Sequence, residues 1–184
     1  MPAITTELLT KFDVPGPRYT SYPTADRFVE AFGQADYLQA LEQRRAGPAA
    51  LALPLSLYVH IPFCESLCYY CACHERSVPY LRYLGKEVDL HVQRMGAGQA
   101  VSQLHLGGGT PTFLNDAELG ELMAMLRRNF NLVPGGEYSI EIDPRTVDAA
   151  RLETLARLGF NRLSFGVQDF DPLVQKAVHR IQPA

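Results

Sequence analysis

Residues 55–73 read LSLYVHIPFCESLCYYCAC, an apolar, β-rich run followed at once by a loop that holds all four cysteines of the chain. Three further strand-like runs follow, at 101–108, 137–144 and 162–168. Helical patterns of period 3.6 lie between and after them, at 79–95, 116–130, 148–158 and 171–182. Strands that alternate with helices predict right-handed crossovers and a parallel sheet. We therefore expect an α/β fold with about four β/α units, a partial TIM-like barrel with half of the eight units that closure needs.

The first 50 residues differ from this regular pattern. The stretch VPGPRYTSYPTADRF (14–28) carries three prolines, and ADYLQALEQRRAG (35–47) indicates one short helix that ends at a glycine. We expect residues 1–50 to form an irregular and helical segment that lies on the barrel. Residues 51–184 are then the first half of the barrel itself.

Composition and charge indicate a globular protein and argue against a nucleic-acid-binding or membrane-spanning one. With 184 residues, 47% hydrophobic and 20% charged, the chain has a globular composition. Its net charge of −3 and its scattered basic residues argue against a nucleic-acid partner. No apolar run approaches the roughly 20 residues of a membrane helix, so we expect a cytoplasmic protein without a membrane span. In that reducing compartment, clustered cysteines more often hold a metal or do chemistry than form disulfides.

The cysteines follow the spacing Cys64-x3-Cys68-x2-Cys71-x-Cys73, directly after the first predicted strand. Parallel α/β folds gather ligands at this end of their strands. Three thiolates on one loop can hold three irons of a 4Fe-4S cluster and leave the fourth iron open. A structural zinc site, an ordinary electron-transfer cluster and buried inert thiols are the alternatives. The lack of a second cysteine pair disfavours zinc.

The cysteine spacing, with Tyr70 just before the third cysteine, resembles that of radical S-adenosylmethionine (radical SAM) enzymes. Five stretches together resemble, in order and spacing, the oxygen-independent coproporphyrinogen III oxidases of heme biosynthesis: GPRYTSYPT, SLYVHIPFCESLCYYCAC, HLGGGTPTFL, SIEIDPRT and NRLSFGVQDF. This resemblance covers nearly the whole chain and less than half of a full family member.

The resemblance implies a 4Fe-4S cluster on Cys64, Cys68 and Cys71, with Cys73 as a family marker that is not a ligand. It also implies two molecules of S-adenosylmethionine. By this resemblance, Tyr58 and Gly108 bind the first S-adenosylmethionine, and Glu141 lies at the mouth of the barrel. The residues that the resemblance assigns to the second S-adenosylmethionine are Tyr70, Gly109, Thr110, Gln168 and Arg180. The glycines of the turn would let bare backbone groups grip a methionine amino group.

The implied reaction is a radical oxidative decarboxylation. One electron splits S-adenosylmethionine into methionine and a 5'-deoxyadenosyl radical, which removes hydrogen from a propionate group of the porphyrinogen substrate. Loss of carbon dioxide and of one more electron then leaves a vinyl group, and the reaction done twice turns coproporphyrinogen III into protoporphyrinogen IX. The partners that the resemblance implies are this porphyrinogen and an electron donor, and it implies a monomer for full-length family members. We also hypothesise that Arg18 binds a propionate as a fork.

Two other functions stay open: a heme chaperone-like radical SAM relative, and a truncated cluster-binding fragment without catalytic activity. Cys73 and the N-terminal RYTSYPT favour the oxidase over the chaperone branch. The chain departs from the family pattern in two places. The loop after Cys73 lacks an Asn-Lys-containing segment, and the sequence stops at Ala184, before the later strands of the barrel.

Overall fold

The computed structural model describes residues 5–12, 27–46, 53–66, 68–69 and 80–182. Contacts divide the chain into two compact units, Met1–Leu38 and Gln39–Ala184. The smaller unit contains helix α1 (Thr6–Phe12) and the start of helix α2 (Gln34–Ala46). The expected division at residue 50, and the packing of the first segment on the barrel, stay predictions.

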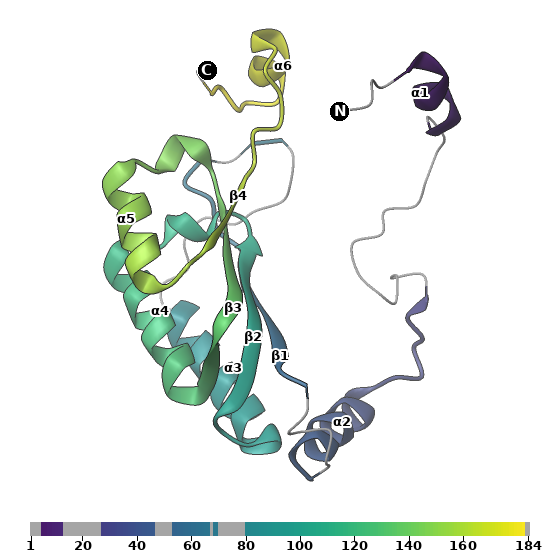
Figure 1. Ribbon diagram of the computed structural model, residues 1–184, viewed down its shortest axis with the longest axis vertical. Coiled ribbons are helices and arrows are strands. Elements are labelled where there is room, and N and C mark those ends of the chain that lie inside the picture. Colours follow the sequence, from purple (N-terminus) through teal and green to yellow (C-terminus); the bar gives the residue numbers. More distant parts are fainter. Residues whose placement is uncertain (1–4, 13–26, 47–52, 67, 70–79, 183–184) are drawn as a thin grey trace. The chain divides into compact units, whose positions relative to one another are not determined.

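The larger unit is built on a parallel sheet in the order β1-β2-β3-β4. Its strands are β1 (Leu55–Ile61), β2 (Gln99–Gly108), β3 (Phe130–Ile142) and β4 (Arg162–Phe165). The helices that connect or follow them are α3 (Tyr80–Met95), α4 (Asp116–Asn129), α5 (Ala149–Leu158) and α6 (Pro172–Ala177), with short 3-10 turns η3 (Pro111–Phe113) and η4 (Pro144–Thr146). Figure 1 shows α3, α4 and α5 on one face of the sheet. The α/β class and the parallel sheet of four β/α units are confirmed.

Strand β3 begins at Phe130, earlier than the predicted start at Glu137. Its first residues pair with the start of β2, and the register then shifts between Val101 and Gln103. The extra residues at this bulge include Gly135, whose φ of 77° suits a residue without a side chain. The Pro-Gly-Gly stretch predicts a turn before the strand, whereas it forms an irregularity within the strand.

Capping residues fix the start of α4 and both ends of α5, whereas α6 ends at Ala177, before the expected end at residue 182. Asn115 Oδ1 accepts from the Glu118 N–H, and Glu118 Oε2 accepts from the Asn115 N–H, both at 2.9 Å, which makes a capping box for α4. Asp148 caps the start of α5, and Gly159, at a φ of 98°, ends that helix. The caps of α4 and α5 thereby fix where the loops that follow the carboxyl ends of β2 and β3 end and the helices begin.

The core lies between the sheet and the helices. Alternate strand residues point into it, among them Val59, Ile61, Leu104, Leu106, Ile140 and Ile142. Helix α4 contributes Leu119, Leu122, Met123 and Leu126, and Met125 packs against this core partly buried. The strand residues between these apolar ones form a second, polar face. None of the helices described is long and apolar enough to span a membrane.

Candidate cofactor-binding site

A cavity of about 230 Å³ brings together eight of the predicted site residues at the carboxyl edge of the sheet. They come from distant parts of the sequence and are Cys64, Cys68, Gly108, Gly109, Thr110, Glu141, Gln168 and Arg180. All parallel strands end at the same edge, so the loops that follow them meet there. Tyr70, Cys71, Cys73 and Arg18 lie outside the described residues.

Two thiols enter this cavity. Cys64 and Cys68 are half-buried and free of disulfide bonds. The Sγ atom of Cys64 lies 3.5 Å from Oγ1 of Thr110, so the cysteine loop contacts the turn after β2. Thiols are the ligands that iron–sulfur clusters use, and this pair fits two positions of such a cluster. The described residues include no group of three His, Cys, Asp or Glu side chains that could hold a metal. The third predicted ligand, Cys71, is not among them.

The glycine-rich turn after β2 is bound to the start of the cysteine loop. Gly109 donates its N–H to Ile61 O at 2.8 Å, and Thr110 donates to Phe63 O at 2.7 Å. A Cβ atom on Gly109 would stand 2.5 Å from Phe63 O, which is too close for any side chain. Gly108 donates its N–H to Glu141 Oε2 at 3.2 Å. The N–H groups of this turn are therefore already used within the protein, and Thr110 O accepts from the Phe113 N–H at 2.8 Å.

Glu141 belongs to the polar face of the sheet. Its side chain is 41% exposed, with Oε1 3.3 Å from Nε2 of His105. The neighbouring isoleucines point to the opposite, buried face. Tyr58 lies on the same face as Glu141: its pKa is raised by burial and, to a smaller extent, by the negative charge of Glu141. Tyr58 therefore lies near the carboxylate, although it does not line the cavity itself.

Arg180 lines the cavity and has a buried donor, Nε, that is not used by the described part of the chain. Its Nη2 donates to Gly166 O at 2.7 Å and lies 3.5 Å from Asp143 Oδ2. Its buried Nε has no hydrogen-bond partner within the described part of the chain. A buried donor without a partner is costly, so an acceptor such as a carboxylate would be stabilised at this point.

Asp143 links two arginines beside the cavity. Burial raises the pKa of this carboxyl, but hydrogen bonds from Arg145 and the charge of Arg180 outweigh burial, and the pKa falls below its ordinary value. The pKa of Arg145 is raised by its hydrogen bond to Asp143 and, more weakly, by Cys68 and Cys64. Asp143 is thus a charged anchor that orients positive side chains near the thiols.

Gln168 lines the cavity with an unusual backbone. Its φ of 57° lies in the left-handed region, where a residue with a side chain costs of order 1–3 kcal/mol. Strain of this kind concentrates at binding sites. Here the Gln168 side chain lies next to Gly166, with its Nε2 2.9 Å from the position that a Cβ atom on Gly166 would occupy.

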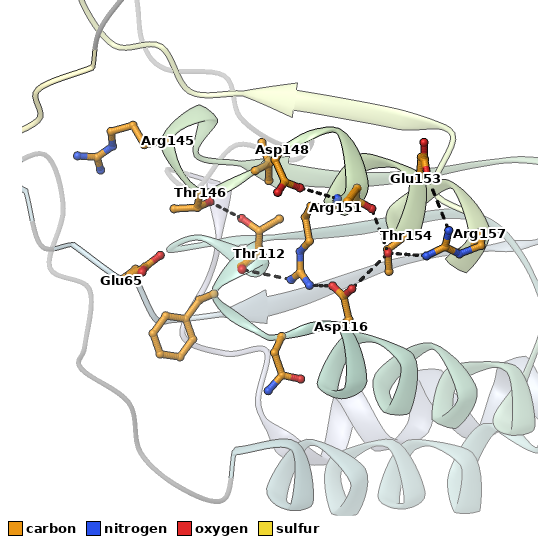
Figure 2. Close-up of a pocket in the computed structure, with 14 residues that line it drawn as sticks. Glu65, Thr112, Asp116, Arg145, Thr146, Asp148, Arg151, Glu153, Thr154 and Arg157 are labelled. Carbon is orange, nitrogen blue, oxygen red and sulfur yellow. Dashed lines mark hydrogen bonds and ion pairs between the residues drawn. The ribbon is translucent and has the colours of Figure 1, made fainter.

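A larger pocket, of about 1120 Å³, lies at the starts of α4 and α5 and is not the predicted site (Figure 2). Several of its polar groups bind one another. Arg151 pairs with Asp116 and donates to Thr112 O, while Thr112 and Thr146 share a hydrogen bond of 3.1 Å. These bonds hold the two helix starts together, so we assign this pocket a structural role and place the candidate site at the smaller cavity.

Comparison with known proteins identifies the family. The profile of the Radical SAM superfamily matches residues 58–184. This chain belongs to the radical SAM superfamily. Oxygen-independent coproporphyrinogen III oxidase from Pseudomonas aeruginosa is 52% identical over 186 residues, covering 96% of this chain and 39% of the relative. The enzyme of the same name from Escherichia coli is 48% identical, covering 95% of this chain and 38% of the relative.

A solved structure agrees with these relatives. The structure of coproporphyrinogen III oxidase from Escherichia coli, described as a radical SAM enzyme, superposes with a TM-score of 0.74 at 46% identity. It covers 95% of this chain and 39% of the solved one. This chain therefore spans about two fifths of the length of these radical SAM relatives.

Sequence reasoning missed three polar residues of this radical SAM chain. Ser139 lies two residues before Glu141 on β3, and Asp143 lies two residues after it, just beyond the end of the strand. His105 of β2 is paired with Ser139. The alternation of polar and apolar residues in SIEID was the signal that could have found the first two. The role of His105 depends on the pairing of strands, which the sequence does not show.

Proposed function

We propose that this chain is the cofactor-binding part of an oxygen-independent coproporphyrinogen III oxidase. The cavity that joins two cysteines of the predicted cluster loop to the glycine turn, Glu141 and Arg180 carries the proposal. The names of the relatives support the substrate, coproporphyrinogen III, and the superfamily supports the kind of chemistry.

In this proposal Cys64, Cys68 and Cys71 hold a 4Fe-4S cluster. When bound, the reduced cluster supplies an electron to S-adenosylmethionine, whose cleavage supplies the oxidant that removes hydrogen from a propionate group. Family resemblance supports two S-adenosylmethionines, and the residues proposed to bind them are Tyr58, Tyr70, Gly108, Gly109, Thr110, Glu141, Gln168 and Arg180.

Two side chains have free hydrogen-bonding capacity that suits S-adenosylmethionine. A carboxylate has about four acceptor sites, and Glu141 uses one on each oxygen for His105 and Gly108. Two sites remain, which matches the two hydroxyls of a ribose. The buried Nε of Arg180 suits the carboxylate of the methionine part. In this proposal the chain binds and orients the cofactor through these groups.

We further propose an external electron donor, a monomeric full-length protein and a cytoplasmic location. Arg18 is proposed to bind a propionate of the porphyrinogen. No contact in the described residues bears on these four points.

Anaerobic reconstitution with iron and sulfide tests the proposal. The wild-type chain should hold about four irons and four sulfides, the content of a single cubane cluster. Cys64→Ala, Cys68→Ala and Cys71→Ala should each lose most of this iron. Cys73→Ala is the matched control, because it removes a thiol from the same loop without removing a proposed ligand, and it should keep the wild-type content.

The second readout is 5'-deoxyadenosine formed after dithionite and S-adenosylmethionine are added to the reconstituted chain. Formation by the wild-type chain and by Cys73→Ala, but not by the three ligand variants, supports the proposal. Zinc bound without sulfide contradicts it. A chain that binds heme and forms no 5'-deoxyadenosine favours the chaperone-like alternative.

A further inference from the structure

A polar row crosses three strands of the sheet beside the cavity. Tyr58 of β1 pairs in register with His105 of β2, which pairs in register with Ser139 of β3. Residues paired in register point to the same face. Glu141 lies two residues beyond Ser139 and so shares that face. The row therefore places an imidazole between a phenol, a hydroxyl and the carboxylate proposed to bind ribose.

The side chains of this row converge over Gly107. A Cβ atom at Gly107 would lie 3.0 Å from Nε2 of His105, 3.0 Å from Cε2 of Tyr58 and 3.1 Å from Cδ of Glu141. These distances are tighter than ordinary van der Waals contact, so a side chain at Gly107 would push the three groups apart. The first glycine of the turn thus leaves the space in which His105 reaches Glu141.

His105 is held on three sides. Its Nδ1 lies 2.6 Å from Oγ of Ser139, and its Nε2 lies 3.3 Å from Oε1 of Glu141. Its ring stacks on that of Tyr58 with centroids 5.8 Å apart and an interplanar angle of 19°. Ser139 is only 5% exposed, and its Oγ also lies 3.3 Å from Leu104 O. A buried hydroxyl therefore meets one nitrogen and a carboxylate meets the other.

These contacts require a hydrogen on Nε2 of His105. An ionised carboxylate only accepts hydrogen bonds, so a bare Nε2 lone pair facing Glu141 would be repelled. If Ser139 donates to Nδ1, the neutral ring carries its hydrogen on Nε2. If Ser139 donates to Leu104 O instead, Nδ1 must donate to Ser139, and the neutral ring leaves Nε2 bare. The 2.6 Å contact of Ser139 Oγ with Nδ1 is shorter than its 3.3 Å contact with Leu104 O, which favours the first arrangement and an Nε2–H donated to Glu141.

We propose that His105 is a positioning residue for cofactor binding: Ser139 orients its ring, and its Nε2–H holds one oxygen of Glu141. Gly108 N–H holds the other oxygen at 3.2 Å. A glutamate side chain held at both oxygens loses its rotamer freedom before the ligand arrives, which lowers the entropic cost of binding. This inference rests on the proposed function, in which Glu141 contacts the ribose of S-adenosylmethionine.

Calorimetric titration of S-adenosylmethionine into the reconstituted chain tests the inference. His105→Ala should raise Kd by about 10-fold, because a hydrogen bond to a charged group is lost. His105→Gln should recover much of the affinity, since its amide nitrogen can donate from the place of Nε2. His91→Ala, on helix α3 across the sheet from the cavity, is the control and should bind as the wild type does. A His105→Ala chain with wild-type Kd overturns the inference.

A second measurement needs no cofactor. Nitrogen-15 NMR of the His105 ring in the chain without ligand should show Nε2 protonated, and Ser139→Ala should change the signal of Nδ1. A ring protonated on Nδ1 alone overturns the inference, whatever the chain binds. A wild-type chain that binds no S-adenosylmethionine contradicts the proposed function instead, and the NMR result then decides the hydrogen-bond arrangement by itself.

Discussion

At the scale of single residues, the glycines of the turn after β2 each have their own reason. Gly107 leaves space for side chains that lean over it, Gly108 adopts a φ of 112°, and Gly109 lies against the backbone of Phe63. The sequence predicts that such glycines let a ligand approach. In the structure Gly108 and Gly109 line the cavity, while protein atoms lie where a Cβ of each of the three glycines would stand.

Gly109→Ala should therefore destabilise the chain. The new Cβ would stand 2.5 Å from Phe63 O, and because a backbone atom cannot swing aside, the turn or the cysteine loop must shift. Overpacking of this kind costs about 1–3 kcal/mol. The free energy of unfolding in urea, measured on the variant and the wild type, checks this value.

Gly120→Ala is the matched control. A Cβ at this position of α4 meets no atom within 4 Å among the described residues outside its own helix backbone. Alanine in a helix interior is more stable than glycine by about 0.5–1 kcal/mol, so this variant should be slightly stabilised. Equal stability of the two variants would contradict the role given to Gly109.

At the scale of elements, strand β3 divides its residues between two faces. Ile140 and Ile142 pack into the core, and Ser139 and Glu141 point to the polar face. The period of two in a strand makes this division unavoidable. Helices keep the strand ends in place, since α4 and α5 begin directly after the loops that border the cavity.

The capping box of α4 gives the prediction at this scale. Asn115→Ala removes the acceptor of the Glu118 N–H and should lower the free energy of unfolding by about 1 kcal/mol. Glu121→Ala, an exposed change within the same helix, should stay within about 0.5 kcal/mol of the wild type. Thermal unfolding followed by circular dichroism measures both, and a loss as large for Glu121→Ala would argue against capping as the cause.

At the scale of the whole molecule, one buried layer holds together the strands whose ends form the cavity. Leu122 of α4 is fully buried in this layer, whereas Leu90 of α3 is 62% exposed. The polar face opposite carries the groups proposed to bind the cofactor. Stability and binding thus depend on opposite faces of the same sheet.

Leu122→Ala should cost about 2–5 kcal/mol, through lost apolar burial and the cavity that remains. Leu90→Ala deletes the same atoms at an exposed position of α3 and should change the free energy of unfolding by about 0.5 kcal/mol or less. Urea unfolding of the two variants measures the contrast. A similar loss for both would mean that Leu122 does not belong to the buried layer.

Much of the fold could be predicted because its signals are local. The strands and helices follow from hydrophobic period, and Asn115, Asp148 and Gly159 mark helix ends through bonds to residues a few positions away. The start of β3 was missed because Pro-Gly-Gly normally signals a turn, and only pairing with β2 keeps it in the strand.

By itself, the sequence determined the order of β/α units, the apolar face of each element and the cysteine spacing that matches the radical SAM superfamily. Each of these depends on neighbours along the chain. Only the tertiary structure decided that His105 meets Ser139 and Glu141, and that Asp143 meets Arg180. For His105, Ser139 and Glu141 the physical reason is strand register: a shift of a single residue would turn these side chains to the other face of the sheet. Asp143 and Arg180 lie outside the strands, and only the folded chain brings their loops together.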